Sequence, residues 1–141
     1  MGLLGRSRDV LRQLLRRDEV PALSIDDPAL VVVVEAFDIA EADSAALARS
    51  PQWRADDLAV LRHHLRIPSE QVERARELLT PDGWAVSTSG VAGDISHISR
   101  VQKLDALHCA QERSRMASLA QRLGGDALGW DALQKPHEPA R

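Results

Sequence analysis

DALHCAQERSRMASLAQRLGGDALGWD, residues 105–131, is the stretch of sequence that decides the fold of this chain. It opens on Asp105, whose carboxylate can accept a hydrogen bond from a free amide of the first helical turn, and it contains Gly124-Gly125, which ends a helix. The sequence therefore predicts a helix over 105–123. After it comes Gly129-Trp130-Asp131. We expect Trp130 to pack onto the body of the protein, because an indole beside two glycines is too large and apolar to stay in water.

Small and apolar residues recur every three or four positions along this helix, which indicates one buried face. The stripe comprises Ala106, Cys109, Ala110, Met116, Ala117, Ala120 and Leu123, with Leu119 beside it. Arg113 falls on the same face, and its aliphatic stem can follow the core edge while its guanidinium reaches water. Cys109 is the only cysteine, so an internal disulfide is excluded, and a small core residue is the expected role.

Composition places the chain among ordinary cytoplasmic domains. It has 141 residues, of which 44% are hydrophobic and 28% charged. A net charge of -3 predicts no general attraction to nucleic acid or to an anionic membrane. The sequence contains no apolar run of membrane-spanning length and no signal peptide pattern, so we expect no membrane association.

Residues 1–17 carry charge of the opposite sign. Five arginines against one aspartate give +4, which leaves -7 for the rest of the chain. If the segment is helical, one side is apolar and consists of Leu4, Val10, Leu11, Leu14 and Leu15. Two interpretations remain open. The helix docks on a partner, RNA or an anionic surface, with Arg12 and Arg16 as interface candidates, or it packs against its own acidic body.

Residues 18–28 hold two prolines and predict a linker, and 29–133 are expected to form one domain followed by a flexible tail over 134–141. The domain begins with the strand at Val31–Val34, whose continuous β-branched run predicts burial on both faces or a central place in a sheet. A short helix is expected over 43–49.

The acidic side chains of this region invite a metal or acid–base interpretation. They are Glu35, Asp38, Glu41 and Asp43. No histidine or nucleophile in the sequence fixes them beside one another, so a solvated surface is the preferred interpretation. We predict no metal, no cofactor and no catalytic residue, and hence a protein that is not an enzyme.

Leucine and isoleucine alternate with arginine and histidine over 58–67, which predicts a strand ended by Pro68. His63 and His64 then point to opposite faces and make a poor chelating pair. Beyond it we expect a helix over 70–79 capped by Ser69, a strand over 84–88 and a loop over 90–93. The mixed segment 95–104 is more typical of an edge or bulged strand.

The predicted order of strand, helix, strand, strand, helix and strand is that of ferredoxin-like α+β folds, in which two helices cover one face of an antiparallel sheet. The Val31–Val34 strand and the N-terminal helix are additions to this plan.

Residues 58–131 resemble the family of the regulator of ribonuclease E activity B, the RraB-like family. The resemblance rests on His63-His64-Leu65, on the turn over 82–86, on the helix from Asp105 and on Gly124-Gly125 followed by Gly129-Trp130-Asp131. It departs from the family at Ala127 and Leu128, where an aromatic and an acidic residue are usual, and it lacks the long acidic tail of some members. The resemblance implies a protein that binds a ribonuclease E type endonuclease and modulates RNA decay.

Alternatives of other classes remain open. One is a small-molecule or effector-binding module, with His63 or His97 lining its pocket. Homodimerisation through an edge strand is another, whereas direct nucleic-acid binding is disfavoured by few aromatics and an acidic body. Gly129, Trp130 and Asp131 either order the surface that meets the partner or simply lock the last helix.

Overall fold

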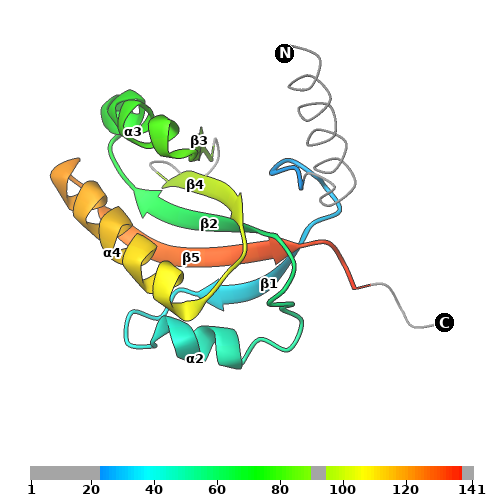
Figure 1. Cartoon of the computed structure of the whole chain (residues 1–141). Coiled ribbons are helices and arrows are strands. Elements are labelled where there is room, and N and C mark those ends of the chain that lie inside the picture. The colour runs from blue at the N-terminus through cyan, green and yellow to red at the C-terminus, as the bar shows by residue number, and fades with distance from the viewer. Residues whose placement is uncertain (1–22, 90–94, 138–141) are drawn as a thin grey trace, which may run out of the picture.

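The structure, a computed structural model, describes residues 23–89 and 95–137. In these residues it is an α+β protein with one five-stranded antiparallel sheet and three α-helices (Figure 1). The elements in chain order are β1 (Val31–Ala36), α2 (Asp43–Ala48), β2 (Ala59–Arg66), α3 (Val72–Leu79), β3 (Ala85–Thr88), β4 (Ile95–Gln102), α4 (Ala106–Arg122) and β5 (Asp126–Gln134). The predicted α+β class and antiparallel sheet are confirmed.

The strand order is β1-β5-β2-β4-β3. Each α3 or α4 connection joins two strands that are separated by a third: β4 lies between β2 and β3, and β2 lies between β4 and β5. The C-terminal β5 therefore runs through the interior of the sheet, where Figure 1 shows it between β2 and β1. Its two neighbours come from the first half of the chain.

One buried cluster joins the sheet to all three helices. Because strand side chains alternate between faces, every second residue of a strand contributes to it. Its members include Leu61 and Leu65 of β2, Ile98 of β4, Trp130 and Ala132 of β5, Ala46 and Leu47 of α2, Ala75 and Leu79 of α3, and Cys109, Met116 and Ala120 of α4. The intervening strand residues lie on the opposite face of the sheet.

The helix α4 forms as its sequence predicts. The Asp105 carboxylate accepts a hydrogen bond from the backbone amide of His108 at 2.8 Å. The buried face is narrower than expected, because Ala110 is exposed, and Leu119 lies in the core rather than beside it. Burial raises the pKa of the Cys109 thiol to about 12, so this cysteine is an inert core residue. No helix of the described residues has the length and apolar character that crossing a membrane requires.

Two predictions about strand position are wrong. β1 is an edge strand that pairs only with β5 among the described residues, and Val31 and Val32 are 44% and 42% exposed. β4, expected at an edge, pairs with β2 on one side and β3 on the other. A β-branched run sets strand propensity but not the choice of neighbour, which depends on pairing between distant segments.

Smaller differences concern the ends of elements. Ser69 does not cap α3, because residues Ser69–Gln71 form a 3₁₀ turn and its hydroxyl makes no capping bond. β5 extends to Gln134, which is fully buried and whose side-chain amide exchanges hydrogen bonds with the backbone of Arg54 at 2.9 and 3.0 Å. The predictions for residues 1–17, the loop at 90–93 and the tail at 138–141 lie outside the described residues.

Gly125 tests how closely β2 and β5 approach. A Cβ at this position would lie 1.8 Å from the carbonyl oxygen of Arg66, so Gly125→Ala forces the two backbones apart. We expect a loss of several kcal/mol, as for other strongly overpacked substitutions. The control is Gly124→Ala, whose Cβ would make only an ordinary contact with Pro68 at 3.9 Å but whose φ of 84° disfavours a side chain, so it should cost only about 1–2 kcal/mol. Urea unfolding of both variants measures the difference, and equal losses would contradict the close approach.

Candidate functional site

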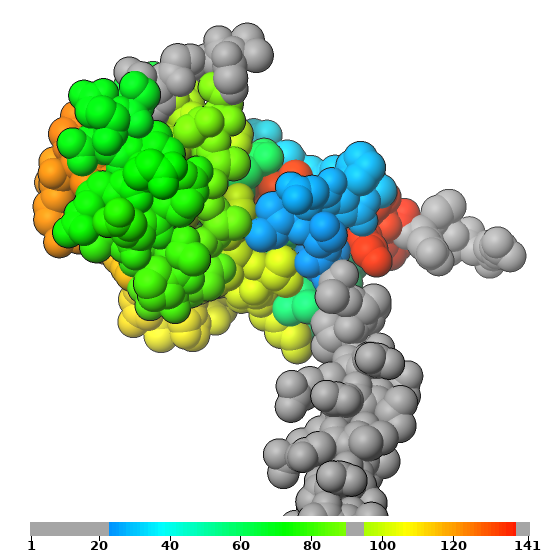
Figure 2. All heavy atoms as spheres, turned by 90° about the horizontal axis from the view of Figure 1, so that it is seen from above, coloured from blue at the N-terminus to red at the C-terminus, as the bar shows by residue number. Residues whose placement is uncertain are grey.

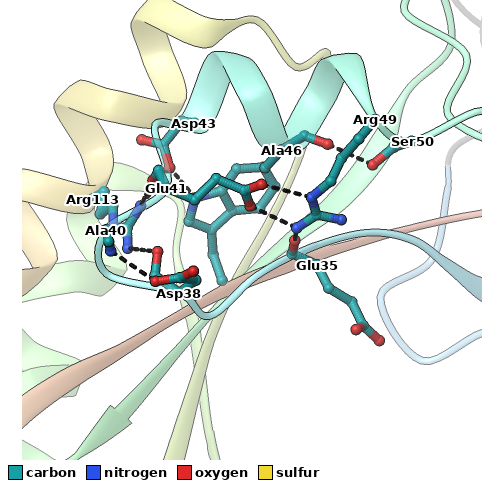
Figure 3. A network of polar contacts seen from close by, with 10 residues as sticks. Glu35, Asp38, Ala40, Glu41, Asp43, Ala46, Arg49, Ser50 and Arg113 are labelled. Carbon is teal, nitrogen blue, oxygen red and sulfur yellow. Dashed lines mark hydrogen bonds and ion pairs between the residues drawn. The ribbon is translucent and has the colours of Figure 1, made fainter.

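Trp130 is held from inside the protein by a buried carboxylate. Its indole Nε1 donates to Oδ1 of Asp43 at 3.0 Å, and Nη1 of Arg113 donates to the same oxygen at 2.7 Å. Trp130 has no exposed surface and Asp43 is 7% exposed. The group joins β5, α2 and α4 (Figure 3). Asp43 was expected to be solvated, and this expectation is wrong. The Arg113 side chain keeps 22% of its surface exposed, and its guanidinium supplies the positive charge that the buried carboxylate of Asp43 needs.

The other acidic residues of this region form hydrogen bonds that stabilise the loop around α2. Arg49 donates to both carboxylate oxygens of Glu41 at 2.7 and 2.8 Å and to the backbone oxygen of Glu35 at 2.6 Å (Figure 3). The hydrogen bond from Arg49 lowers the pKa of Glu41. Asp38 accepts from the amide of Ala40 within its own turn. These carboxylates do not converge on a common point.

A second polar group lies on the opposite face of the sheet, around Asp131. Arg62 donates to the two carboxylate oxygens through Nε and Nη2 at 2.8 and 2.7 Å, and Nε2 of His64 lies 3.0 Å from Oδ1. Burial by itself would raise the pKa of Asp131, but the hydrogen bonds from His64 and Arg62 outweigh it, and the pKa is lowered. Asp131 is therefore ionised at neutral pH, and all of its bonds are charge-assisted.

Three rings lie in a row beside this carboxylate. The imidazole of His64 meets the ring of Phe37 at 4.9 Å and the imidazole of His97 at 4.4 Å, centroid to centroid, and both contacts are edge-to-face. His64 and His97 are direct partners in the pairing of β2 with β4. The side chain of His64 is 16% exposed, and His97 is half-buried.

His63, by contrast, points into the core. It is almost fully buried, its ring lies 5.5 Å from that of Trp84, and its Nε2 has no hydrogen-bond partner among the described residues. Burial lowers the pKa of His63 to about 3, so the ring stays neutral in the folded protein. The expectation that His63 and His64 face opposite ways is confirmed. The two pocket candidates, His63 and His97, lie on different faces and line no common pocket.

Gly129 allows the end of β1 to cross close to β5. Its φ is 138°, and a Cβ there would lie 2.4 Å from the carbonyl oxygen of Ala36 and 2.8 Å from the Phe37 ring. Only glycine fits such a position without strain. Gly129, Trp130 and Asp131 are all buried. They order the residues around them, while Arg12 and Arg16, the other interface candidates, lie outside the described residues.

Sequence reasoning missed the contacts of Asp131 with Arg62 and of His64 with His97. The signal that could have found them is alternation: Arg62, His64 and Arg66 share one face of a predicted strand, so charged and imidazole side chains from neighbouring strands should gather there. The register needed to choose the partners is not local information. Within residues 23–89 and 95–137, no three side chains of the histidine, cysteine, aspartate and glutamate types are grouped as metal ligands.

Comparisons with known proteins add no relative. No family model, no curated protein and no solved structure matches this chain.

Asp43→Ala tests the buried group. The substitution leaves the buried indole N–H of Trp130 without its acceptor and removes the carboxylate that balances the charge of Arg113, so we expect a loss of about 2 kcal/mol or more in the free energy of unfolding. Glu41→Ala, which removes only an exposed pair with Arg49, is the control and should change stability little. Chemical denaturation checks both, and a small effect of Asp43→Ala would show that the group is dispensable.

His63 predicts acid sensitivity. The unfolded chain takes up a proton at this ring below about pH 6.5, whereas the folded protein does so only near pH 3, so stability falls as the pH drops through this window. This residue alone should cost about 2 kcal/mol between pH 7 and pH 5. In His63→Leu, with its fold checked at pH 7, the loss of unfolding free energy between pH 7 and pH 5 should be smaller by this amount. An unaltered pH dependence in His63→Leu, equal to that of the exposed control His108→Asn, would refute it.

Proposed function

We propose that the chain is a non-enzymatic, cytoplasmic regulator that binds a ribonuclease E type endonuclease and modulates its activity by protein contact. In this proposal β2 to β5 with α3 and α4 form a ferredoxin-like unit whose two helices cover one face. The strand order β5-β2-β4-β3 supports it, because two interleaved β-α-β units produce that order. The partner is taken from the resemblance of residues 58–131 to the RraB-like family.

The observation that carries protein binding is the concentration of exposed apolar side chains around β1. Six large hydrophobic residues of the described part are exposed, and five of them fall between residues 25 and 39: Ile25, Val31, Val32, Phe37 and Ile39. Figure 2 shows the blue segment before β1 lying at the surface beside the red end of β5. Contiguous exposed apolar surface is typical of protein interaction sites, and we propose that side chains of this segment provide it. We call residues 25–39 the β1 surface.

Charge and backbone geometry limit how a partner can meet the β1 surface. The backbone oxygen of Glu35 already accepts a hydrogen bond from Arg49. A strand of a partner therefore cannot pair with β1 along its full length. The carboxylates of Asp26, Glu35 and Asp38 lie among the exposed apolar residues. A partner that contributes apolar side chains together with lysine or arginine therefore fits best, and contact through side chains is favoured over extension of the sheet.

Ile39→Ser tests the β1 surface. Ile39 is 93% exposed, so the substitution should leave the fold intact. If a partner buries this side chain, its loss weakens binding by roughly 1.5–3 kcal/mol, or about 10- to 150-fold in Kd. The measurement is binding of the full chain to the purified ribonuclease E type enzyme of the same host, followed by cleavage of a fluorogenic RNA with and without the chain.

Leu107→Ser is the matched control, because Leu107 is also exposed, at 63%, but belongs to α4 and not to residues 25–39. It should bind as the unmodified chain does. Equal weakening by both variants would reject the β1 surface, and no binding of the unmodified chain to the enzyme would reject the proposed target.

A further inference from the structure

The row of rings on the face of the sheet opposite the core contains a pair of imidazoles from two different strands. His64 of β2 and His97 of β4 are directly opposite in the register, and their ring centroids are 4.4 Å apart. Residues directly opposite across antiparallel strands have Cβ atoms about 5 Å apart, so both rings project from the same place on the same face. Rotation of the His97 ring about χ2, a soft torsion, can turn one of its nitrogens toward the His64 ring.

The surroundings fix which nitrogens can serve as ligands. Both carboxylate oxygens of Asp131 accept hydrogen bonds from Arg62, so the carboxylate acts as an acceptor here and Nε2 of His64, 3.0 Å from Oδ1, is the donor. The lone pair of the neutral His64 ring is then on Nδ1. A histidine whose second nitrogen is held by a carboxylate is the usual arrangement around a bound metal ion, because the carboxylate fixes the ring and makes it more basic.

We propose that His64 and His97 form a two-nitrogen site for a divalent transition-metal ion of the Cu²⁺, Ni²⁺ or Zn²⁺ class. Imidazole nitrogens favour these ions over Mg²⁺ and Ca²⁺, which prefer oxygen. The protein supplies two ligands, and water or an external chelator completes the coordination. The site binds its ion whether or not the chain docks on a ribonuclease.

The charged groups around His64 and His97 are compatible with a bound cation. The cationic side chain beside His64, Arg62, is paired with Asp131 through two hydrogen bonds, so its charge is largely offset. His97 is half-buried and lies directly opposite His64 on the neighbouring strand, so both rings are within reach of one ion. His64 retains access to solvent.

The test uses the untagged full chain and Cu²⁺–iminodiacetate, in which the chelator occupies part of the coordination sphere and leaves positions for two imidazoles. We expect one complex per chain near neutral pH, and electron spin-echo modulation with the signature of two coordinated imidazoles. His97→Asn should show at most one imidazole and bind roughly tenfold or more weakly, because the second ring acts as a ligand of high effective concentration.

His108→Asn is the matched control, since His108 is exposed on α4 and outside the pair, and it should retain the two-imidazole signal. Thermal unfolding confirms that each variant is folded, and His97→Gln replaces His97→Asn if the latter is not. A one-imidazole signal from the unmodified chain, or an unchanged two-imidazole signal in the folded His97 variant, would overturn the site.

Discussion

The fold depends on the hydrogen bond between the indole of Trp130 and the carboxylate of Asp43. A buried indole N–H needs an acceptor, and here the acceptor is a buried carboxylate that in turn needs a cation, which Arg113 provides. One residue each from β5, α2 and α4 thus completes the group. A six-residue helix such as α2 is too short to be stable alone, so this contact also explains why it forms.

The three residues Gly129, Trp130 and Asp131 act on both faces of the sheet. Gly129 lets the end of β1 come close, Trp130 enters the core, and Asp131 holds Arg62 and His64 on the opposite face. Each of the three residues makes a contact that stabilises the fold, so the motif is explained by structure before any role in binding is considered. The β1 surface lies outside residues 58–131 and therefore does not include this motif.

Much of the secondary structure could be predicted because its causes are local. The Asp105 cap, the alternation at β2 and the apolar side of α3 are all contained in short windows of sequence. Strand neighbours could not be predicted in the same way, and β1 and β4 exchanged their expected edge and inner places. The order of the strands follows from the insertion of β5 between β1 and β2. This insertion pairs segments that are far apart in the sequence, such as Val31 and Gln134, which are about a hundred residues apart.

The candidate site shows the same limit, since neither His64 with His97 nor Arg62 with Asp131 is close in sequence. The pairing register of the strands brings these side chains together. The side chains in turn restrict which register is stable. A slip of one residue between β2 and β5 would turn Asp131 toward the core and place its charge among the leucines of β2, Leu61 and Leu65. Burying an unpaired carboxylate there costs far more than any gain from the slip. The polar cluster that forms the candidate site therefore also selects the register of the sheet that carries it.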